Sequence, residues 1–275
     1  MIHAPITATD IESAKPVSLA EACRACRTAA PLGIAITMAF QPIVDLHTGD
    51  IFAYEALVRG VDGRSAGEVL AGVGPDMIYK FDQACRVKAI ELAGHLFRPD
   101  DGAKLSINFM PNAVYEPDAC IRASLAAARR VAFDPTRLMF EFTENEEMVD
   151  TSHVAGIIDT YQRMGFTTAL DDFGAGHAGL SLLAKFQTDV IKLDMELVRG
   201  IDASLPRRMI VEGLLAMFAR MDIAAVAEGV ETQAEYDVLR AMGVRYMQGY
   251  LLAAPGFRTL PRHVLPQQEP IARHA

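Results

Sequence analysis

The sequence is poor in cysteine and in basic side chains. It has four cysteines in 275 residues, too few for a disulfide framework in a chain of this length, so we expect a reducing, cytoplasmic setting. Its 35 acidic residues outnumber the 26 basic ones, which gives a formal net charge of −9. Because non-specific binding to nucleic acid needs a basic face, no nucleic-acid polymer is expected as a partner. A small anionic ligand stays possible if a metal meets its charge.

Long apolar runs are absent as well. The most apolar stretch, from Ala29 to Phe40, is interrupted by Pro31 and Gly33 and is too short to cross a bilayer. The first ten residues have neither a positively charged side chain nor a long apolar run, so the sequence does not predict a signal peptide there. We therefore expect a soluble protein with no membrane partner. A composition that is 51% hydrophobic and 22% charged is that of an ordinary globular protein.

Short runs rich in Val, Ile, Phe and Leu alternate with longer amphipathic stretches, a pattern typical of repeated βα units. Eight strands are predicted, at Met38–Asp45, Ile51–Arg59, Leu105–Phe109, Leu138–Thr143, Thr167–Asp172, Val190–Asp194, Ala224–Glu228 and Tyr246–Leu252. Helical patterns lie between most of the later strands, at Met77–Leu96, Ala119–Ala132, Ser152–Met164, Arg207–Met221 and Thr232–Met242.

A helix between successive strands forces parallel pairing, and eight strands in this length favour a closed barrel. The short connection around Gly49 suits a hairpin, so the first two strands should be antiparallel. The prediction is an α/β protein, a TIM-like (β/α)8 barrel with an antiparallel first strand; a doubly wound open sheet is the alternative. We expect residues 1–35 to form an N-terminal arm with a short helix around Leu19–Arg27, residues 36–258 the barrel, and residues 259–275 a C-terminal tail.

Polar side chains lie within or at the ends of these apolar strands. They are Glu55, Asn108, Glu141, Asp171, Asp172, Lys192, Glu228 and Gln248. The parallel strands of a barrel bring their carboxyl ends to one rim, so residues far apart in the sequence would meet there.

Carboxylates gathered at one rim would repel one another unless they shared protons or bound hard divalent cations. Six belong to this set or follow it closely, namely Glu55, Glu141, Asp171, Asp172, Glu228 and Glu231. The amide of Asn108 adds a neutral oxygen, which suits Mg²⁺ or Mn²⁺ better than Zn²⁺. Two such ions form a recurrent clamp for phosphate-ester hydrolysis, and Lys192 would supply a positive charge to water or phosphate.

Each of these residues also has a structural interpretation. Glu55 or Glu141 alone could lie on a solvated outer face, and Lys192 with Asp194 could form a structural ion pair. Asp171 and Asp172 could simply mark a strand entering a turn. Only the joint occurrence of so many polar residues at strand ends favours a site.

Eight short motifs follow one another along the chain. They are Phe40-Gln-Pro-Ile-Val-Asp45, Tyr54-Glu-Ala-Leu-Val-Arg59, Ser106-Ile-Asn108, Glu141-Phe-Thr-Glu144, Asp171-Asp-Phe-Gly-Ala-Gly176, Ile191-Lys-Leu-Asp194, Ala227-Glu-Gly-Val-Glu-Thr232 and Gln248-Gly-Tyr250. In this order they resemble the EAL-domain family of cyclic di-GMP phosphodiesterases, over roughly Ile36 to Pro255. The resemblance implies a metal-dependent hydrolase that converts cyclic di-GMP to linear pGpG, and we expect a homodimer.

The resemblance also assigns roles. It implies two Mg²⁺ or Mn²⁺ ions, held by Glu55, Asn108, Glu141, Asp171, Asp172 and Glu228. Lys192 would contact the metal-bound water, Glu228 is a candidate base, and Glu55 completes the catalytic set. Substrate contacts are implied for Gln41, Arg59, Asp194, Glu231 and Gln248, and Glu144 matches the acid that steadies the loop after Asp172. The alternative function is a non-catalytic EAL module that binds cyclic di-GMP or a partner protein as a regulator.

Overall fold

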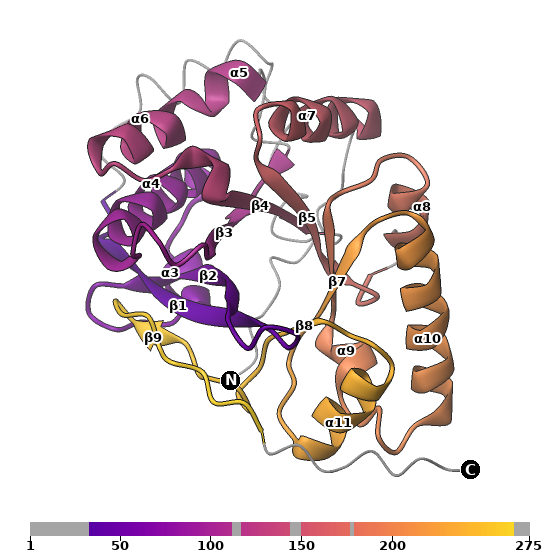
Figure 1. Cartoon of the computed structure of the whole chain (residues 1–275). Helices are drawn as coiled ribbons and strands as arrows, with labels where there is room; N and C mark the ends of the chain where they lie inside the picture. Colours follow the sequence, from indigo (N-terminus) through magenta and orange to yellow (C-terminus); the bar gives the residue numbers. More distant parts are fainter. Residues whose placement is uncertain (1–32, 112–116, 144–149, 177–178, 267–275) are drawn as a thin grey trace.

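The computed structural model describes residues 33–111, 117–143, 150–176 and 179–266. Eight of its strands close into a barrel (Figure 1), which confirms the predicted fold. They are β1 (Ile36–Asp45), β2 (Ile51–Gly60), β3 (Lys104–Phe109), β4 (Leu138–Thr143), β5 (Thr167–Phe173), β6 (Val190–Leu193), β7 (Ala224–Ala227) and β8 (Tyr246–Met247). Strand β1 is antiparallel to both of its barrel neighbours, β2 and β8, whereas β2 to β8 run parallel to one another.

Helices surround the strands (Figure 1), and their bounds are α3 (Ala66–Leu70), α4 (Ile78–Leu96), α5 (Pro117–Cys120), α6 (Arg122–Arg130), α7 (Thr151–Arg163), α8 (Gly179–Leu183), α9 (Met195–Val198), α10 (Leu205–Arg220) and α11 (Gln233–Ala241). Helix α4 packs against β1 and β3, and α7 packs against β5. Polar caps define where several helices begin. The Ser204 hydroxyl accepts from the Arg207 amide at the start of α10, and Thr232 forms a capping box with Glu235 at the start of α11.

Most predicted elements match the observed ones to within one or two residues at each end, and two differ by more. The helix expected at Ala119–Ala132 is divided into α5 and α6, with Ile121 between them. The strand expected at Tyr246–Leu252 ends after Met247. After Met247 the chain forms a turn, in which the Leu252 amide donates to the Gly249 carbonyl. This turn contacts the segment that follows β7, because the Leu251 amide donates to the Val230 carbonyl.

A ninth strand, β9 (Gly256–Phe257), pairs with β1 outside the barrel. The chain after it stays attached to the barrel, because the Tyr54 hydroxyl donates to the Pro261 carbonyl (3.2 Å) and the Val264 amide donates to the Leu252 carbonyl (3.0 Å). None of the helices in the described part of the chain combines the length and the apolarity that crossing a bilayer requires.

The apolar core has two parts. The larger part lies between strands and helices, where Phe109, Phe140, Tyr161 and Phe166 meet largely edge to face. The smaller part is a layer of side chains from seven strands, namely Ile43, Ala53, Met139, Ala169, Val190, Val226 and Tyr246. Since side chains alternate between the two faces of a strand, the residue two positions along each strand lies on the same face as this layer.

Candidate active site

A layer of polar side chains follows the smaller apolar layer. Moving two residues from that layer toward the carboxyl end of the parallel strands reaches Glu55, Glu141, Asp171, Lys192 and Glu228. In the antiparallel β1, the equivalent step from Ile43 runs backward and reaches Gln41. The same step from Tyr246 of β8 reaches Gln248. A strict period of two therefore places seven polar residues, on or directly after seven strands, on one face, and the barrel closure brings them together.

Lys192 lies at the centre of this layer. Its side chain is buried, and its Nζ forms ion pairs with Glu228 Oε1 (2.7 Å), Asp171 Oδ1 (2.9 Å), Glu141 Oε1 (3.1 Å) and Glu55 Oε2 (3.6 Å). The four carboxylates come from or directly follow β2, β4, β5 and β7. The predicted metal ligands and the predicted catalytic lysine thus share one site, and the interpretation of Lys192 as the partner of Asp194 in an ion pair is wrong.

Amide side chains extend the layer on the side of β1 and β2. Gln248 donates to Glu55 Oε2 (2.8 Å) and to Gln41 Oε1 (3.2 Å), and Gln41 donates to the Ala253 carbonyl (3.1 Å). The Asn108 amide donates to Glu55 Oε1 at 3.4 Å. Glu55 is therefore held by two amides and by Lys192.

Two hydroxyl groups that the sequence analysis missed also belong to the site. The buried Ser106 hydroxyl donates to Glu141 Oε1 at 2.5 Å, and the Thr143 hydroxyl donates to Asp172 Oδ2 at 3.1 Å. Each lies two residues from a predicted ligand on the same strand, Ser106 before Asn108 and Thr143 after Glu141. The period of two would have identified both, since residues at that spacing share a face.

The enclosure of so many charges shifts their pKa values. Burial raises the pKa of Glu141 to about 8, with Glu55 and Asp171 adding to the rise against the opposing effect of Lys192. Burial, and then the charge of Asp171, raises the pKa of Asp172 to about 7. For Lys192, burial lowers the pKa, but the four carboxylates outweigh it and the net shift is upward. The metal-free site therefore resists holding all of its carboxylates in ionised form.

The carboxylates form two overlapping groups that suit a hard cation. Within the described residues, Glu55, Glu141 and Asp171 offer oxygens that all lie within 4.8 Å of one another, and so do Asp171, Asp172 and Glu228. Asp171 belongs to both groups. Glu141 Oε2 is buried and has no hydrogen-bond partner, which leaves an acceptor that a cation would satisfy. An all-oxygen donor set of this kind fits Mg²⁺, Mn²⁺ or Ca²⁺.

The remaining predicted site residues lie outside this cluster or have other partners. The Arg59 guanidinium donates to the Val58 carbonyl (2.7 Å), and Asp194 caps α9 by accepting from the Glu196 amide (2.7 Å). The half-exposed Glu231 forms an ion pair with Arg199. Glu144 lies outside the described residues. The structure brings the predicted metal ligands together but leaves the contacts of Arg59, Asp194 and Glu231 with a substrate as predictions.

Comparison with known proteins decides the family. The model of the EAL domain matches residues 27–255. The chain belongs to the EAL-domain family. A standalone EAL protein from Vibrio cholerae, solved with c-di-GMP bound, is 50% identical with a TM-score of 0.81, and the match covers 85% of this chain and 98% of that one. BlrP1 from Klebsiella pneumoniae, solved as a calcium and cy-diGMP complex, is 32% identical with a TM-score of 0.78, over 86% of this chain and 60% of that one.

Curated relatives of this EAL-domain chain are longer proteins. The blue light- and temperature-regulated antirepressor BluF of Escherichia coli is 32% identical over 84% of this chain and 57% of its own length. The probable cyclic di-GMP phosphodiesterase PdeA of the same species is 29% identical over 76% of this chain and 31% of its own length. The chain thus spans between about a third and somewhat more than half of these relatives. One relative is named for catalysis and the other for regulation.

Proposed function

We propose that this EAL-domain chain is a metal-dependent phosphodiesterase that hydrolyses cyclic di-GMP to linear pGpG. The observation that carries the proposal is the pair of carboxylate groups that share Asp171 and enclose Lys192. Each predicted metal ligand lies in the described part of the chain, and the five carboxylates among them all belong to the two groups. The structural relative from Vibrio cholerae, at 50% identity, is named as a c-di-GMP-bound protein, which supports the choice of substrate.

Charge balance supports two divalent ions, which we propose to be Mg²⁺ or Mn²⁺. With Glu55, Glu141, Asp171, Asp172 and Glu228 all ionised, the single ammonium of Lys192 leaves four negative charges, and two divalent ions would neutralise them. Asn108 would add its amide oxygen to the donor set. Bound ions of this kind lower the pKa of a water molecule and neutralise charge on a phosphate. A doubly anionic substrate would then no longer be repelled by an acidic protein.

Other side chains of the site would stabilise charge, transfer a proton and hold the substrate. Lys192 would stabilise negative charge on the attacking oxygen, because its Nζ already lies among the ligands and is excluded from bulk water. Glu228 would accept the proton of the attacking water, because its carboxylate lies in the cluster at 2.7 Å from Lys192, and burial raises its pKa above the usual value of a carboxyl group. Gln248, which donates to both Gln41 and Glu55, would together with Gln41 hold a substrate against the ligands from the side of β1, while Arg59 would meet a phosphate at the rim.

The test is the incubation of purified protein with cyclic di-GMP and Mg²⁺ or Mn²⁺, followed by chromatography for pGpG. We expect turnover by the wild type and its loss in Glu55→Gln. The matched control is Glu91→Gln, which removes a carboxylate of α4 that pairs with Arg130 of α6 and belongs to neither carboxylate group, and should leave turnover unchanged. A folded wild type that releases no pGpG with either metal refutes the proposed activity.

A second candidate function is that of a receptor or regulator without catalysis. The name of BluF, an antirepressor that is 32% identical to this chain, is the observation that favours it. Isothermal titration with cyclic di-GMP separates the two functions. Tight binding without release of pGpG in Mg²⁺ or Mn²⁺ would support the receptor, and release of pGpG would support the enzyme.

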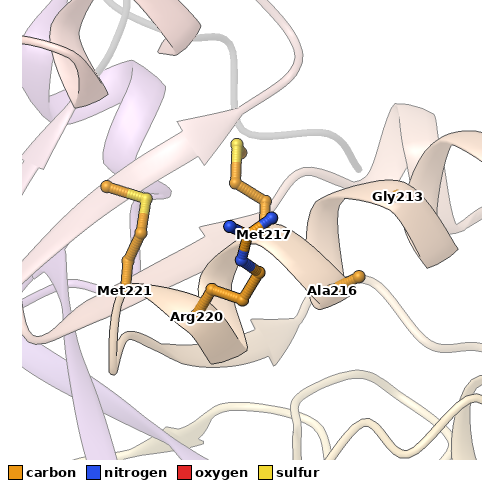
Figure 2. A pocket seen from close by; sticks show the side chains of 5 residues that line it. All are labelled: Gly213, Ala216, Met217, Arg220 and Met221. Carbon is orange, nitrogen blue, oxygen red and sulfur yellow. The ribbon is translucent and has the colours of Figure 1, made fainter.

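We also propose that two copies associate through α10. This helix exposes Leu205, Met209 and Ile210, and a shallow cavity of about 400 Å³ lies along its later part, lined by Gly213, Ala216, Met217, Arg220 and Met221 (Figure 2). Large apolar side chains and small residues on one surface helix favour close packing against a partner. Sedimentation of the wild type should show a dimer, and Met209→Lys should shift it to the monomer. A wild type that stays monomeric at high concentration refutes the association.

A further inference from the structure

Two hydroxyl groups make direct hydrogen bonds to the candidate metal ligands. Ser106, on β3, donates to Glu141 Oε1 on β4, and Thr143, on β4, donates to Asp172 Oδ2 on β5. In both pairs a side chain on one strand holds a carboxylate on the next strand. Neither hydroxyl is itself among the carboxylates and the amide that would contact the ions.

The two hydrogen bonds serve different groups of carboxylates. Glu141 belongs to the group with Glu55 and Asp171, whereas Asp172 belongs to the group with Asp171 and Glu228. Only Asp171 is common to both groups, and the two hydrogen bonds are made to the other members, Glu141 and Asp172. Loss of one hydroxyl should therefore disturb one cation position and leave the ligands of the other in place.

At Glu141 the Ser106 hydroxyl determines which oxygen is available. Oε1 accepts from Ser106 at 2.5 Å and pairs with Lys192 at 3.1 Å, while Oε2 is buried without a hydrogen-bond partner. The carboxylate is thus oriented by contacts on one oxygen, and the other oxygen is left for a cation. Ser106 is completely buried, so water does not replace its hydroxyl without structural change.

At Asp172 the Thr143 hydroxyl acts on a residue with unusual backbone geometry. Asp172 has a φ of 55°, in the left-handed region, and the register between β5 and β6 shifts between Leu170 and Phe173. A residue other than glycine in this region costs about 1 kcal/mol or more and persists when its surroundings impose it. Because Asp172 lies outside the regular strand ladder, the hydrogen bond from Thr143 supplies an orientation that the strand itself does not.

We propose that Ser106 and Thr143 are positioning residues that set the affinities of two metal positions independently, Ser106 through Glu141 and Thr143 through Asp172. The inference rests on the proposed function, because it requires cations at the two carboxylate groups. Outer partners that orient metal-binding carboxylates typically change metal affinity by about 10–100-fold when they are removed. The two positions should accordingly be separable by single substitutions that leave every carboxylate present.

The experiment is a titration of the metal-free full chain with Mn²⁺, in which free Mn²⁺ is counted by electron paramagnetic resonance. We expect two ions on the wild type. Thr143→Val, which keeps the shape of the side chain and removes the hydroxyl, should weaken one ion at least tenfold and leave the other unchanged. Thr143→Ser should restore both ions, and Ser106→Ala should also weaken only one.

Combined substitutions identify which ion is affected. In an Asp172→Asn background, Thr143→Val should have no further effect, whereas Ser106→Ala should still weaken the remaining ion. The matched control is Thr168→Val, which removes a buried hydroxyl that bonds to Asp189 instead of a candidate ligand, and should leave both affinities unchanged. Thermal unfolding of each variant checks the fold. If Ser106→Ala does not fold, Thr143→Val and Thr143→Ser still decide the question, since Thr143 is less buried.

The outcomes separate this inference from the proposed function. A wild type that binds no Mn²⁺ refutes the proposed function and the inference with it. A wild type that binds two ions, together with a Thr143→Val variant that binds both with unchanged affinity, refutes the inference alone. Equal weakening of both ions in Thr143→Val also overturns it, because the positions would then not be independent.

Discussion

Replacement of Lys192 by methionine tests whether one ammonium stabilises the cluster of acids in the metal-free protein. Methionine has a similar length but no charge. The substitution removes four ion pairs, with Nζ to oxygen distances of 2.7, 2.9, 3.1 and 3.6 Å, from a lysine that is buried. Carboxylates that were compensated by Lys192 would then face one another in the barrel.

The magnitude follows from the cost of breaking a buried ion pair. Removing one partner of such a pair destabilises a protein by about 3–5 kcal/mol, because a buried charge is left uncompensated. For a chain of this size, each kcal/mol lowers the unfolding temperature by roughly 2–4 °C. We therefore expect metal-free Lys192→Met to unfold roughly 6–20 °C below the wild type at neutral pH.

Metal should reverse much of this loss. A ligand that binds only the folded state stabilises it by about 2.7 kcal/mol at a concentration of 100 times Kd. Divalent ions supply the positive charge that the variant lacks, so the difference in unfolding temperature should narrow as Mn²⁺ is added. Turnover of cyclic di-GMP should stay low even then, because the ions do not replace the positive charge that Lys192 would direct at the attacking oxygen.

The assay is thermal unfolding followed by circular dichroism, with and without chelator. Lys104→Met is the matched control, since Lys104 is a partly buried lysine at the start of β3 whose pKa is lowered by burial. Removing that charge should change stability little. An unfolding temperature of metal-free Lys192→Met equal to that of the wild type would refute the reasoning that Lys192 compensates the carboxylates.

Three further outcomes are expected. Glu228→Gln should retain the fold by circular dichroism and lose pGpG release by a factor of about one hundred or more in the chromatographic assay. Gly249→Ala should lower stability in urea unfolding by about 3 kcal/mol, since a Cβ at Gly249 would overlap the backbone of Val230; unchanged stability would contradict the packing. The hydrogen bonds from Arg245 hold the pKa of Asp45 below its usual value. They therefore stabilise the folded protein above about pH 4, and this contribution to the free energy of unfolding is lost on acidification. Asp45→Asn should accordingly unfold at a lower temperature than the wild type at pH 7, and this difference should narrow as the pH falls below about 4.

Local patterns in the chain are enough to predict the order of the elements and the face on which each strand carries its polar residue. The hairpin around Gly49, the parallel strands that follow and the candidate ligands were all predicted from local patterns, and the structure bears out the barrel. These features depend on hydrophobic periodicity and turn composition, which are properties of neighbouring residues.

The relation between strands was decided by the tertiary structure. Asn108 lies opposite Glu141, and Glu55 lies opposite both Gln41 and Ser106. These pairings depend on the register of strands that belong to separate βα units or to the opening hairpin. Register is determined by packing across the whole barrel, so no local pattern of residues could specify which carboxylates would surround Lys192.

The same reason explains what the sequence analysis missed. The ion pair of Glu231 with Arg199 joins residues from two separate βα units, and the left-handed backbone of Asp172 lies where the register between β5 and β6 shifts. The capping of α9 by Asp194 is a local contact with the amide of Glu196. Ser106 and Thr143 carried a local signal, their spacing of two from predicted ligands, but no indication of their partners. The sequence thus determined which residue types lie on the interior face, and the closed barrel decided which of them are in contact.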